Sequence, residues 1–559
     1  MYLFWKTNQT GKKYYCLGEN KKIDGKSVRI KEIYLGTADK LYELIYSKSD
    51  LEKINTYEYG LTTALLQSIR ETGLYKILNE ILPFKIRGVP ASIVIIIILL
   101  NKIINPKSKN SINQWYTHSV ICKILPINHG KLSGQFFFDC LQKLDQKIIH
   151  KIESKMAKMV KKVENLDSIL CDMTKIETYI QEHEGNILPM RGRTGRRSIN
   201  VALMITRDNS IPLFHISYPG NVNDVTEFAE VVKILEKKYN LLSGYGKKKI
   251  TIMIDKGNNN EKNINGLEDA GYYFVGRLRP SSYEDLLSVP LSKFKDKYEG
   301  KQDVISYSIF KEIYGRIRKV VIKFDKKSFD KSYAEFMDLI ERRKTSIKKL
   351  ESKTNYALQY GTKKSKSYWS KEENLHKAVK TILTKEPTSN LFTYVLNHKK
   401  DRVFVNININ QEEYDKRINL IGKYVLFTNR KKWDHNKIIK AFYDQYLIEH
   451  QYKTLKGERI KIKPLNHWTD NSIRADIFLS ILSLQIMNLF LTKVRTNKIP
   501  LSNNQILDSL EQIKISYYKL KGNKHDFDLI NDMNKEENLL YSKLDLKNKN
   551  TFSYIKKAF

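Results

Sequence analysis

The sequence predicts an α/β protein built around a mixed β-sheet that is flanked by helices. Two observations support this prediction. Residues 166–280 contain short apolar runs separated by turn residues, with one segment of helical spacing among them, and residues 421–500 repeat the pattern as a strand followed by a long helix. Strands that alternate with helices are typical of a sheet covered by helices. With 559 residues, 41% of them hydrophobic, the chain is long enough for roughly three to four domains.

The segments before this core are predicted in chain order. Residues 1–40 hold three strand-like runs split by Gly and Asn, which indicates a small β meander. Residues 41–165 show three-to-four spacing of apolar residues, so we expect a helical region that serves in recognition. Its most apolar run, "ASIVIIIILL" at 91–100, is well short of the ~20 residues that span a bilayer. A buried helix is therefore expected there, without a membrane.

The core is predicted in two pieces, residues 166–280 and 421–500. Between them, residues 281–420 are interpreted as an insertion domain with a strand hairpin, "DVISYSIFKEIYGRIRKVVIKFD", and a charged helical excursion. Residues 501–559 are polar and are predicted to form a helical C-terminal tail.

Charge and cysteine usage narrow the partner and the compartment. The 98 Lys and Arg against 61 Asp and Glu give a net charge of +37, which favours a polyanion such as nucleic acid, or an anionic membrane surface. Part of this charge reflects a composition rich in Lys, Ile, Asn and Tyr together, as an A+T-rich coding sequence gives. The four cysteines have no paired spacing, so neither a disulfide framework nor a thiolate zinc site is indicated. No signal peptide is apparent either, and a cytoplasmic location is expected.

Two carboxylates stand where strands are predicted to end. Asp172 closes "SILCDMT", and Asp255 closes "TIMID" before a Gly-Asn turn. In open α/β sheets, sites lie at the carboxyl ends of strands, and hard oxygen ligands there suit Mg²⁺ or Mn²⁺. The alternative is that each Asp simply caps a turn, and for one such Asp alone this alternative is favoured.

A third acid lies on the long helix that follows. In "AFYDQYLIEHQYKTLKG", the positions Phe442, Gln445, Glu449, Tyr452 and Lys456 are three or four residues apart, so they share one helix face. An adjoining apolar line is predicted to seat the helix on the sheet. Glu449 would then complete a metal site and Lys456 would meet a phosphate, whereas an ordinary amphipathic helix is the alternative.

These motifs resemble the DDE transposases of bacterial and archaeal insertion sequences. The closest resemblance is to the superfamily whose last motif is Tyr, two residues, Arg, three residues, Glu, six residues, Lys. The match covers roughly residues 167–482. It includes "DSILCDMTKIE", "GRTGRRSINVALMITRDNSIPLFHISYPGNVND", "TIMIDKGNNNEKN", "GYYFVGRLR", "GKYVLFTN", "YLIEHQYKTLK" and "IKPLNHWTDNSIRADIFLSIL".

The resemblance implies an RNase H-like core interrupted by a β-rich insertion, with Asp172, Asp255 and Glu449 as catalytic and metal-binding residues. It implies Mg²⁺, for which Mn²⁺ may substitute, and two-metal phosphoryl transfer: cleavage at the element's ends, then attack of the 3′-hydroxyl on target DNA. Double-stranded DNA, carrying the terminal repeats or the target, is the implied partner. A homodimer or larger synaptic complex, in the nucleoid of a prokaryotic cytoplasm, is the implied assembly.

The DNA contacts follow the motif less closely. Lys456 matches the family lysine, but the family Tyr falls on Phe442 and the family Arg on Gln445, with Lys453 as a candidate substitute for the missing charge. A Gly-containing turn is a further candidate DNA contact or, equally, a solvated loop; its arginines are Arg191, Arg193, Arg196 and Arg197. Two other functions stay open, namely a catalytically impaired DNA-binding descendant of a transposase and a metal-dependent nuclease without strand transfer.

Overall fold

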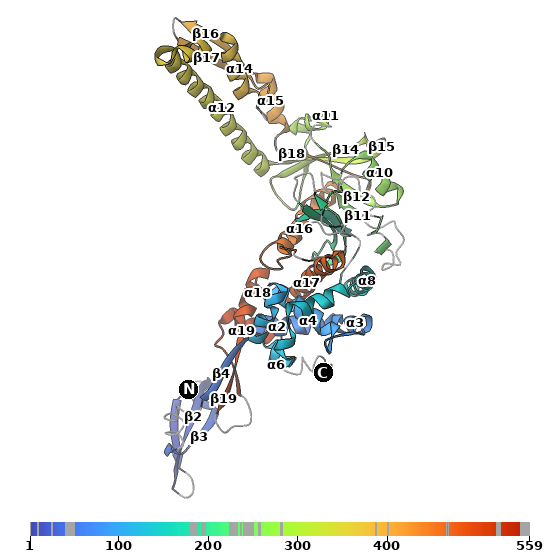
Figure 1. Ribbon diagram of the computed structural model, residues 1–559, viewed down its shortest axis with the longest axis vertical. Coiled ribbons are helices and arrows are strands. Elements are labelled where there is room, and N and C mark those ends of the chain that lie inside the picture. The colour runs from blue at the N-terminus through green and yellow to red at the C-terminus, as the bar shows by residue number, and fades with distance from the viewer. Residues whose placement is uncertain are drawn as a thin grey trace. The chain divides into compact units, whose positions relative to one another are not determined.

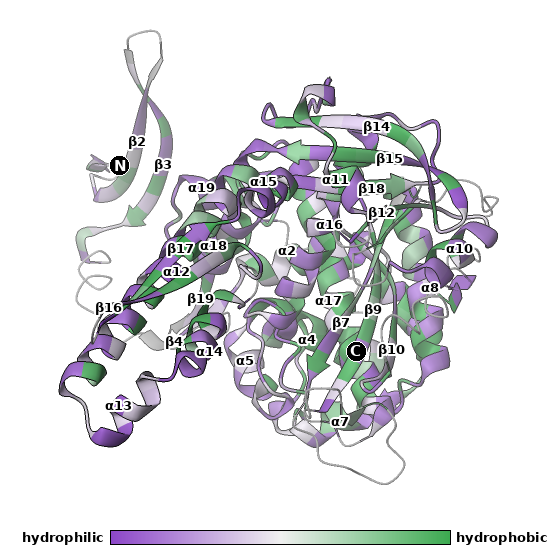
Figure 2. Cartoon of the chain, turned by 90° about the horizontal axis from the view of Figure 1, so that it is seen from above, coloured by the Kyte–Doolittle hydropathy of each residue, from purple (hydrophilic) through white to green (hydrophobic). Residues whose placement is uncertain are grey.

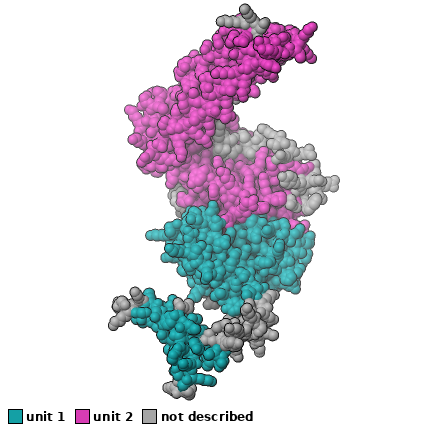
Figure 3. Space-filling model, turned by 90° about the vertical axis from the view of Figure 1, so that its left-hand side faces the viewer, with its two compact units in different colours: residues 1–75, 84–137, 490–559 teal, residues 76–83, 138–489 magenta. Residues whose placement is uncertain are grey.

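The computed structural model describes the larger part of the 559-residue chain, in two compact units that are coloured separately in Figure 3. The first unit comprises residues 1–75, 84–137 and 490–559, and the second comprises residues 76–83 and 138–489. The described residues are 2–7, 11–23, 26–39, 51–164, 166, 168–178, 188, 190–191, 197–222, 233–234, 237–238, 251–254, 259–279, 283–385, 388–399, 402–465, 467, 469–520 and 527–547.

The first unit begins with three antiparallel strands, β1 (Tyr2–Thr7), β2 (Lys13–Ile23) and β3 (Lys26–Gly36). Helices follow, and α4 (Ala91–Ile104) is buried on all sides, as a helix that is hydrophobic all round must be. The expected buried helix at 91–100 is thus confirmed. The first unit also contains α2 (Gly60–Glu71), α5 (Ile112–His118) and α6 (Ile121–Ile124). Two further helices, α3 (Leu74–Ile81) and α7 (Gly134–Gln142), begin in the first unit and end in the second.

Two of the helix predictions were wrong in this unit. The segment Leu51–Glu58 is a strand, β4, and it pairs antiparallel with β19 (Lys514–Leu520), which in turn pairs with β20 (Phe527–Ile530). The C-terminal segment is therefore a mixture of these strands with α18 (Asn503–Gln512) and α19 (Lys535–Lys543), and not a purely helical tail. The pairing joins residues more than 450 positions apart, which local spacing of apolar residues cannot reveal.

The second unit contains a large mixed sheet with the strand order β10-β9-β7-β11-β12-β18-β15-β14-β13. Neighbours β10, β9 and β7 are antiparallel; β7, β11 and β12 are parallel; the remaining neighbours are antiparallel. Parallel strands point the same way, so β7, β11 and β12 end at the same edge of the sheet. The bounds are β7 (Ser168–Glu177), β9 (Arg197–Thr206), β10 (Pro212–Pro219), β11 (Thr251–Ile254), β12 (Tyr273–Arg277), β13 (Asp296–Lys297), β14 (Val304–Ile313), β15 (Arg316–Asp325) and β18 (Lys423–Thr428).

Helices cover this sheet because its strands are apolar on both faces. Nearly every residue of β9 and β10 is buried, and Figure 2 shows these strands in the hydrophobic colour. Helix α8 (Gln146–Val163) packs on β10, and α17 (Asp470–Thr496) is fixed to the same strand by side chains. Arg474 donates to the Ser217 carbonyl at 2.9 Å, and Gln485 donates to the Pro212 carbonyl at 2.6 Å.

A buried ionic cluster ties α8 to β10. Glu153 accepts from the backbone N–H of His215 at 3.0 Å, lies 2.6 Å from His215 Nδ1, and accepts from Lys238 Nζ at 2.9 Å. All three side chains are at least nine-tenths buried. Burial by itself would raise the pKa of Glu153, but the charges and hydrogen bonds of His215 and Lys238 outweigh it and lower that pKa to about 2.

The insertion begins later in the chain than predicted. The hairpin at 304–325 forms as expected, but β15 pairs with β18, so the hairpin extends the main sheet. The excursion itself occupies residues 326–420. It has its own apolar core around Ile347, Val379 and Val403. Its elements are α12 (Lys326–Tyr360), α13 (Lys363–Trp369), α14 (Glu372–Leu383), β16 (Phe392–Lys399), β17 (Arg402–Ile409) and α15 (Gln411–Leu420), and Figure 1 shows α12 alongside the β16–β17 hairpin.

Helix α17 is long and apolar enough to cross a membrane by length and composition. However, 89% of its most apolar 18-residue stretch is buried inside the fold. The bent pair formed by α4 and residues 109–118 passes the same test only if its 96° bend is counted as one span. Buried core helices of soluble proteins have this composition as well.

Candidate functional site

Helix α16 (His435–Lys456) contacts β7, β11 and β12, and also β15 and β18. It starts at Asp434, whose carboxylate accepts from the Lys437 N–H at 2.7 Å, a standard N-cap. Ala441, Ile448 and Leu455 are buried, so the predicted apolar line does seat the helix on the sheet.

The predicted neighbouring face of α16 carries the contacts to the strands. Gln445 Nε2 donates to the Ile254 carbonyl at 2.7 Å, at the last residue of β11. One turn or more further on, Tyr452 OH donates to the Asp172 carbonyl on β7 at 2.6 Å. Lys456 Nζ then donates to the hydroxyl of Thr174 on the same strand. A single helix face is therefore bonded to two neighbouring parallel strands at their common edge.

Asp172 does not end its strand, as the sequence suggested, because β7 continues to Glu177 through its pairing with β9. On the other side, the last pair of β7 with β11 among the described residues is Leu170 with Met253. Asp172 lies two residues further along β7, with a half-buried side chain. The prediction that the strand ends at Asp172 was therefore wrong.

Glu449 lies on the bonded face of α16, between Gln445 and Tyr452, and its side chain is exposed. Asp255 follows Ile254 directly in the sequence and is outside the described residues. Among the residues that the structure does describe, no three His, Cys, Asp or Glu side chains form a group that could hold a metal ion. Because Asp255 is outside the described residues, this absence does not test the triad of Asp172, Asp255 and Glu449, which stays a prediction.

Burial and charge set the ionisation of the two polar residues beside Asp172. The pKa of Tyr452 is raised well above its usual range, mainly by burial and further by the charge of Asp172, so its hydroxyl remains a donor to the strand. Burial lowers the pKa of Lys456, and Lys463 lowers it further, whereas Asp172 and Glu177 raise it. Asp172 and Lys456 thus lie close enough to interact electrostatically.

The structure describes some of the other predicted DNA contacts and not the rest. Lys453 is exposed on α16, and Arg197 begins β9 with a half-buried side chain. Arg191 belongs to the short strand β8 (Met190–Arg191), whereas Arg193 and Arg196 lie outside the described residues. The amide of Gln445 is hydrogen-bonded to the backbone of β11, so the contact observed for this residue positions a strand.

No family model matches the chain, and no curated protein matches it. Among solved structures, the chain is similar to the piggyBac transposase in a synaptic complex with hairpin DNA, determined by electron cryomicroscopy. The two share 9% sequence identity, with 79% of each chain covered and a TM-score of 0.39. Similarity this low leaves the functional argument to the residues of the site.

Sequence reasoning missed a cationic and aromatic cluster next to the site. Arg277, the last residue of β12, has its guanidinium 4.5 Å from the Tyr424 ring centre and 5.9 Å from that of Phe442. Lys323 of β15 is 1% exposed and lies 4.6 Å from the Phe442 ring centre. Arg277 was detectable because it lies within the motif "GYYFVGRLR". Lys323 was not, because its strand was assigned to the insertion.

The buried lysine of this cluster has an acid partner. Lys323 Nζ is 3.7 Å from Asp325 Oδ2 and donates to Tyr443 OH at 3.0 Å, and Tyr443 OH donates to Asp325 at 2.7 Å. Burial lowers the pKa of Lys323 to about 8, against the opposing effect of Asp325. A buried cation without such partners would be costly. Because Lys323 and Asp325 lie on β15 and Tyr443 lies on α16, their hydrogen bonds also hold these two elements together.

Proposed function

We propose that this chain is a DNA transposase of the DDE type, which cuts DNA at the ends of its element and joins the 3′-hydroxyl to target DNA. The observation that supports this proposal is the pair of bonds from one face of α16, Gln445 to Ile254 and Tyr452 to Asp172. They attach the helix that carries Glu449 to β7 at Asp172 itself and to the last residue of β11, which directly precedes Asp255 in the sequence. This is the arrangement that a site built from the three carboxylates would need.

The sheet topology supports an RNase H-like core within this proposal. The five strands at one end of the sheet are, in spatial order, β10, β9, β7, β11 and β12. Neighbours among β10, β9 and β7 are antiparallel, whereas β11 and β12 run parallel to β7. Helices α16 and α17 follow these strands in the chain. The insertion between β12 and α16 accounts for the long interval between Asp255 and Glu449.

The donor set fits a hard divalent cation. Asp172 and Glu449 offer carboxylate oxygens, which Mg²⁺ and Mn²⁺ prefer. One is half-buried and the other exposed, which leaves room for the waters and substrate phosphates that complete the coordination of Mg²⁺. Asp172, Asp255 and Glu449 would hold the cation. A pair of such ions supplies activation of the attacking oxygen and stabilisation of the leaving oxygen in an in-line displacement at phosphorus.

The protein's own groups position the reaction. Tyr452 and Gln445 donate hydrogen bonds to the main-chain carbonyls of Asp172 and of Ile254, the residue before Asp255, and so position the backbone next to these two acids. Lys456 places a cation beside Asp172, where it can meet a phosphate oxygen of the scissile strand. The exposed Lys453 adds charge on the same helix. The partner we propose is double-stranded DNA, bound by a homodimer or larger synaptic complex in a prokaryotic nucleoid.

The test is DNA cleavage by the full chain and by Asp172→Asn. The substrate is a plasmid carrying the DNA that flanks the coding sequence on both sides, incubated with Mg²⁺ or Mn²⁺. We expect the wild-type chain to cut at the element's ends and to insert them into a second plasmid. Asp172→Asn should bind the same DNA with unchanged affinity and lose both activities. Glu458→Gln, an exposed carboxylate just past the end of α16, is the matched control and should keep both.

The alternatives give different results in the same assay. A chain that binds the ends and never cuts them with either metal is the impaired DNA-binding descendant. A chain that cuts without joining is a nuclease. Cleavage that persists in Asp172→Asn would overturn the assignment of the site itself.

A further inference from the structure

The excursion of residues 326–420 carries a strong charge of its own. Its part between residues 342 and 402 contains sixteen Lys and Arg against five Asp and Glu, a net charge of +11 in 61 residues. Within the part of the excursion that the structure describes, most of these cations are exposed. A charge this dense favours a polyanion.

One face of α12 combines this charge with aromatic rings. Lys349, Lys353, Tyr356 and Tyr360 follow one another at steps of four, three and four, so they lie in line along the helix, and we call them the α12 stripe. All four side chains are exposed, and the tyrosines are 68% and 67% exposed. The two rings are neighbours, with centroids 5.4 Å apart.

The opposite face of α12 already accounts for the stability of the helix. Ile340, Ile347 and Thr354, seven residues apart, are buried, and Ile347 belongs to the apolar core that joins α12 to α14 and β17. Folding of the excursion therefore does not need the tyrosines of the stripe. Among the described acids, none forms an ion pair with Lys349 or Lys353. The stripe is thus available for a partner.

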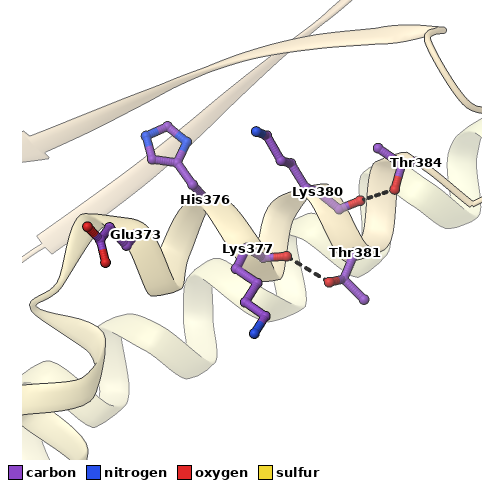
Figure 4. Close-up of a pocket in the computed structure, with 6 residues that line it drawn as sticks. All are labelled: Glu373, His376, Lys377, Lys380, Thr381 and Thr384. Atoms are coloured by element: carbon purple, nitrogen blue, oxygen red, sulfur yellow. Dashed lines mark hydrogen bonds between the residues drawn. The ribbon is translucent and has the colours of Figure 1, made fainter.

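A second basic surface in the excursion is a weaker candidate. A hollow of about 610 Å³ beside α14 is lined by Lys377 and Lys380. Figure 4 shows Lys380 and His376 pointing to one side of the helix and Lys377 to the other. The hollow also contains the carboxylate of Glu373, and its only ring, His376, lies 2.9 Å from the Tyr394 hydroxyl. It offers less charge and no free aromatic face.

We propose that the α12 stripe binds single-stranded DNA, with the lysines on the phosphates and the tyrosines stacked on unpaired bases. Exposed aromatic rings between cations suit this ligand because every base presents a flat apolar face and every nucleotide a negative charge. A duplex would use the lysines but leave the rings without stacking partners. The inference rests on α12 alone and not on the three acids, although both proposals name DNA.

The experiment measures binding of the full chain to a twelve-nucleotide thymidine strand and to a duplex of equal length, without divalent metal. Tyr356→Ala/Tyr360→Ala should weaken single-strand binding by about tenfold or more, the usual effect of losing a stacked base. It should leave duplex binding unchanged. Tyr356→Phe/Tyr360→Phe keeps the rings and should bind as the wild type does.

The charge contribution is read from salt dependence. Lys349→Gln/Lys353→Gln should reduce the slope of log affinity against log salt by about 1.4, since each phosphate contact to a single strand contributes roughly 0.7. The matched control is Lys326→Gln/Lys331→Gln on the same helix, where both lysines are paired with acids, and it should leave the slope unchanged.

A direct readout excludes other basic surfaces as the binding site. A strand carrying 5-iodouracil should crosslink on irradiation to Tyr356 or Tyr360, identified by mass spectrometry. Crosslinks elsewhere only, or equal losses for duplex and single strand in the alanine pair, would overturn the proposal. Asp172→Asn should crosslink as the wild type does, so failure of the catalytic proposal is recognised separately.

Discussion

Replacing Glu153 by Gln should destabilise the second unit strongly, because it removes the charge at the centre of a buried cluster. The carboxylate accepts hydrogen bonds from the His215 main chain and from Lys238, and it lies 2.6 Å from His215 Nδ1. Glutamine keeps the shape but leaves Lys238 buried without a counter-charge. Breaking a buried pair in this way costs about 3–5 kcal/mol of unfolding free energy.

The pKa of Glu153 gives a second route to the same magnitude. Its pKa is lowered from 4.5 to about 2 in the folded protein. A lowered pKa contributes stability that is present above the unfolded value and lost as pH falls through the folded one. The difference corresponds to about 3 kcal/mol, all of it present at pH 7 and lost between about pH 4.5 and pH 2.

The assay is hydrogen–deuterium exchange of residues 212–219 in β10, which reports local opening next to the cluster. In the wild type, protection of this strand should fall as pH drops from 5 to 3, after correction for the intrinsic exchange rate. In Glu153→Gln, protection should be low at every pH and lack this dependence. The control is Glu80→Gln, which breaks an exposed ion pair with Lys155 of α8 and should leave the protection of β10 almost unchanged, because exposed ion pairs contribute little to stability. Equal protection in Glu153→Gln and wild type at pH 7 would refute the reasoning.

Two further predictions concern the site itself. The pKa of Lys323 is about 8 in the folded protein and 10.5 in the unfolded chain. The unfolding free energy of the wild type should therefore rise by up to about 3 kcal/mol between pH 8 and pH 10.5. Lys323→Met should lack this rise. Urea unfolding at successive pH values measures this difference, and parallel curves for the two proteins would contradict it. Tyr452→Phe removes the donor to the Asp172 carbonyl and should cost about 1 kcal/mol in the same unfolding assay. It should also slow DNA cleavage more than it weakens DNA binding; an equal effect on both would show that the hydroxyl does not position Asp172.

The sequence allowed the local elements of the core to be predicted, since each depends on its own spacing of apolar residues. The apolar runs at 168–174, 198–208 and 211–221 are observed as β7, β9 and β10, and the long helix predicted within residues 421–500 is observed as α16. The predicted helix "DVTEFAEVVKILEKKYN" lies almost entirely outside the described residues. Spacing along one helix also identified the face that contacts the strands, because those positions follow from 3.6 residues per turn.

What the sequence could not reveal was which distant segments pair. The segment of β4 lies in a region where three-to-four spacing of apolar residues predicts helices, yet it is a strand that pairs with β19 near the other end of the chain. The end of β7 was placed too early for a similar reason. The sequence predicts that the strand ends at Asp172, whereas pairing with β9 keeps it extended to Glu177.

The two departures from the family motif have a structural explanation in this chain. Gln445 stands where the motif has Arg, and its amide is hydrogen-bonded to the end of β11, a contact that needs a donor but no charge. Phe442 stands where the motif has Tyr, and its ring lies under the cations Arg277 and Lys323. Positive charge therefore lies beside this part of the helix, although Lys323 is buried and paired with Asp325. The cleavage assay of Asp172→Asn is the measurement that separates enzyme from binder.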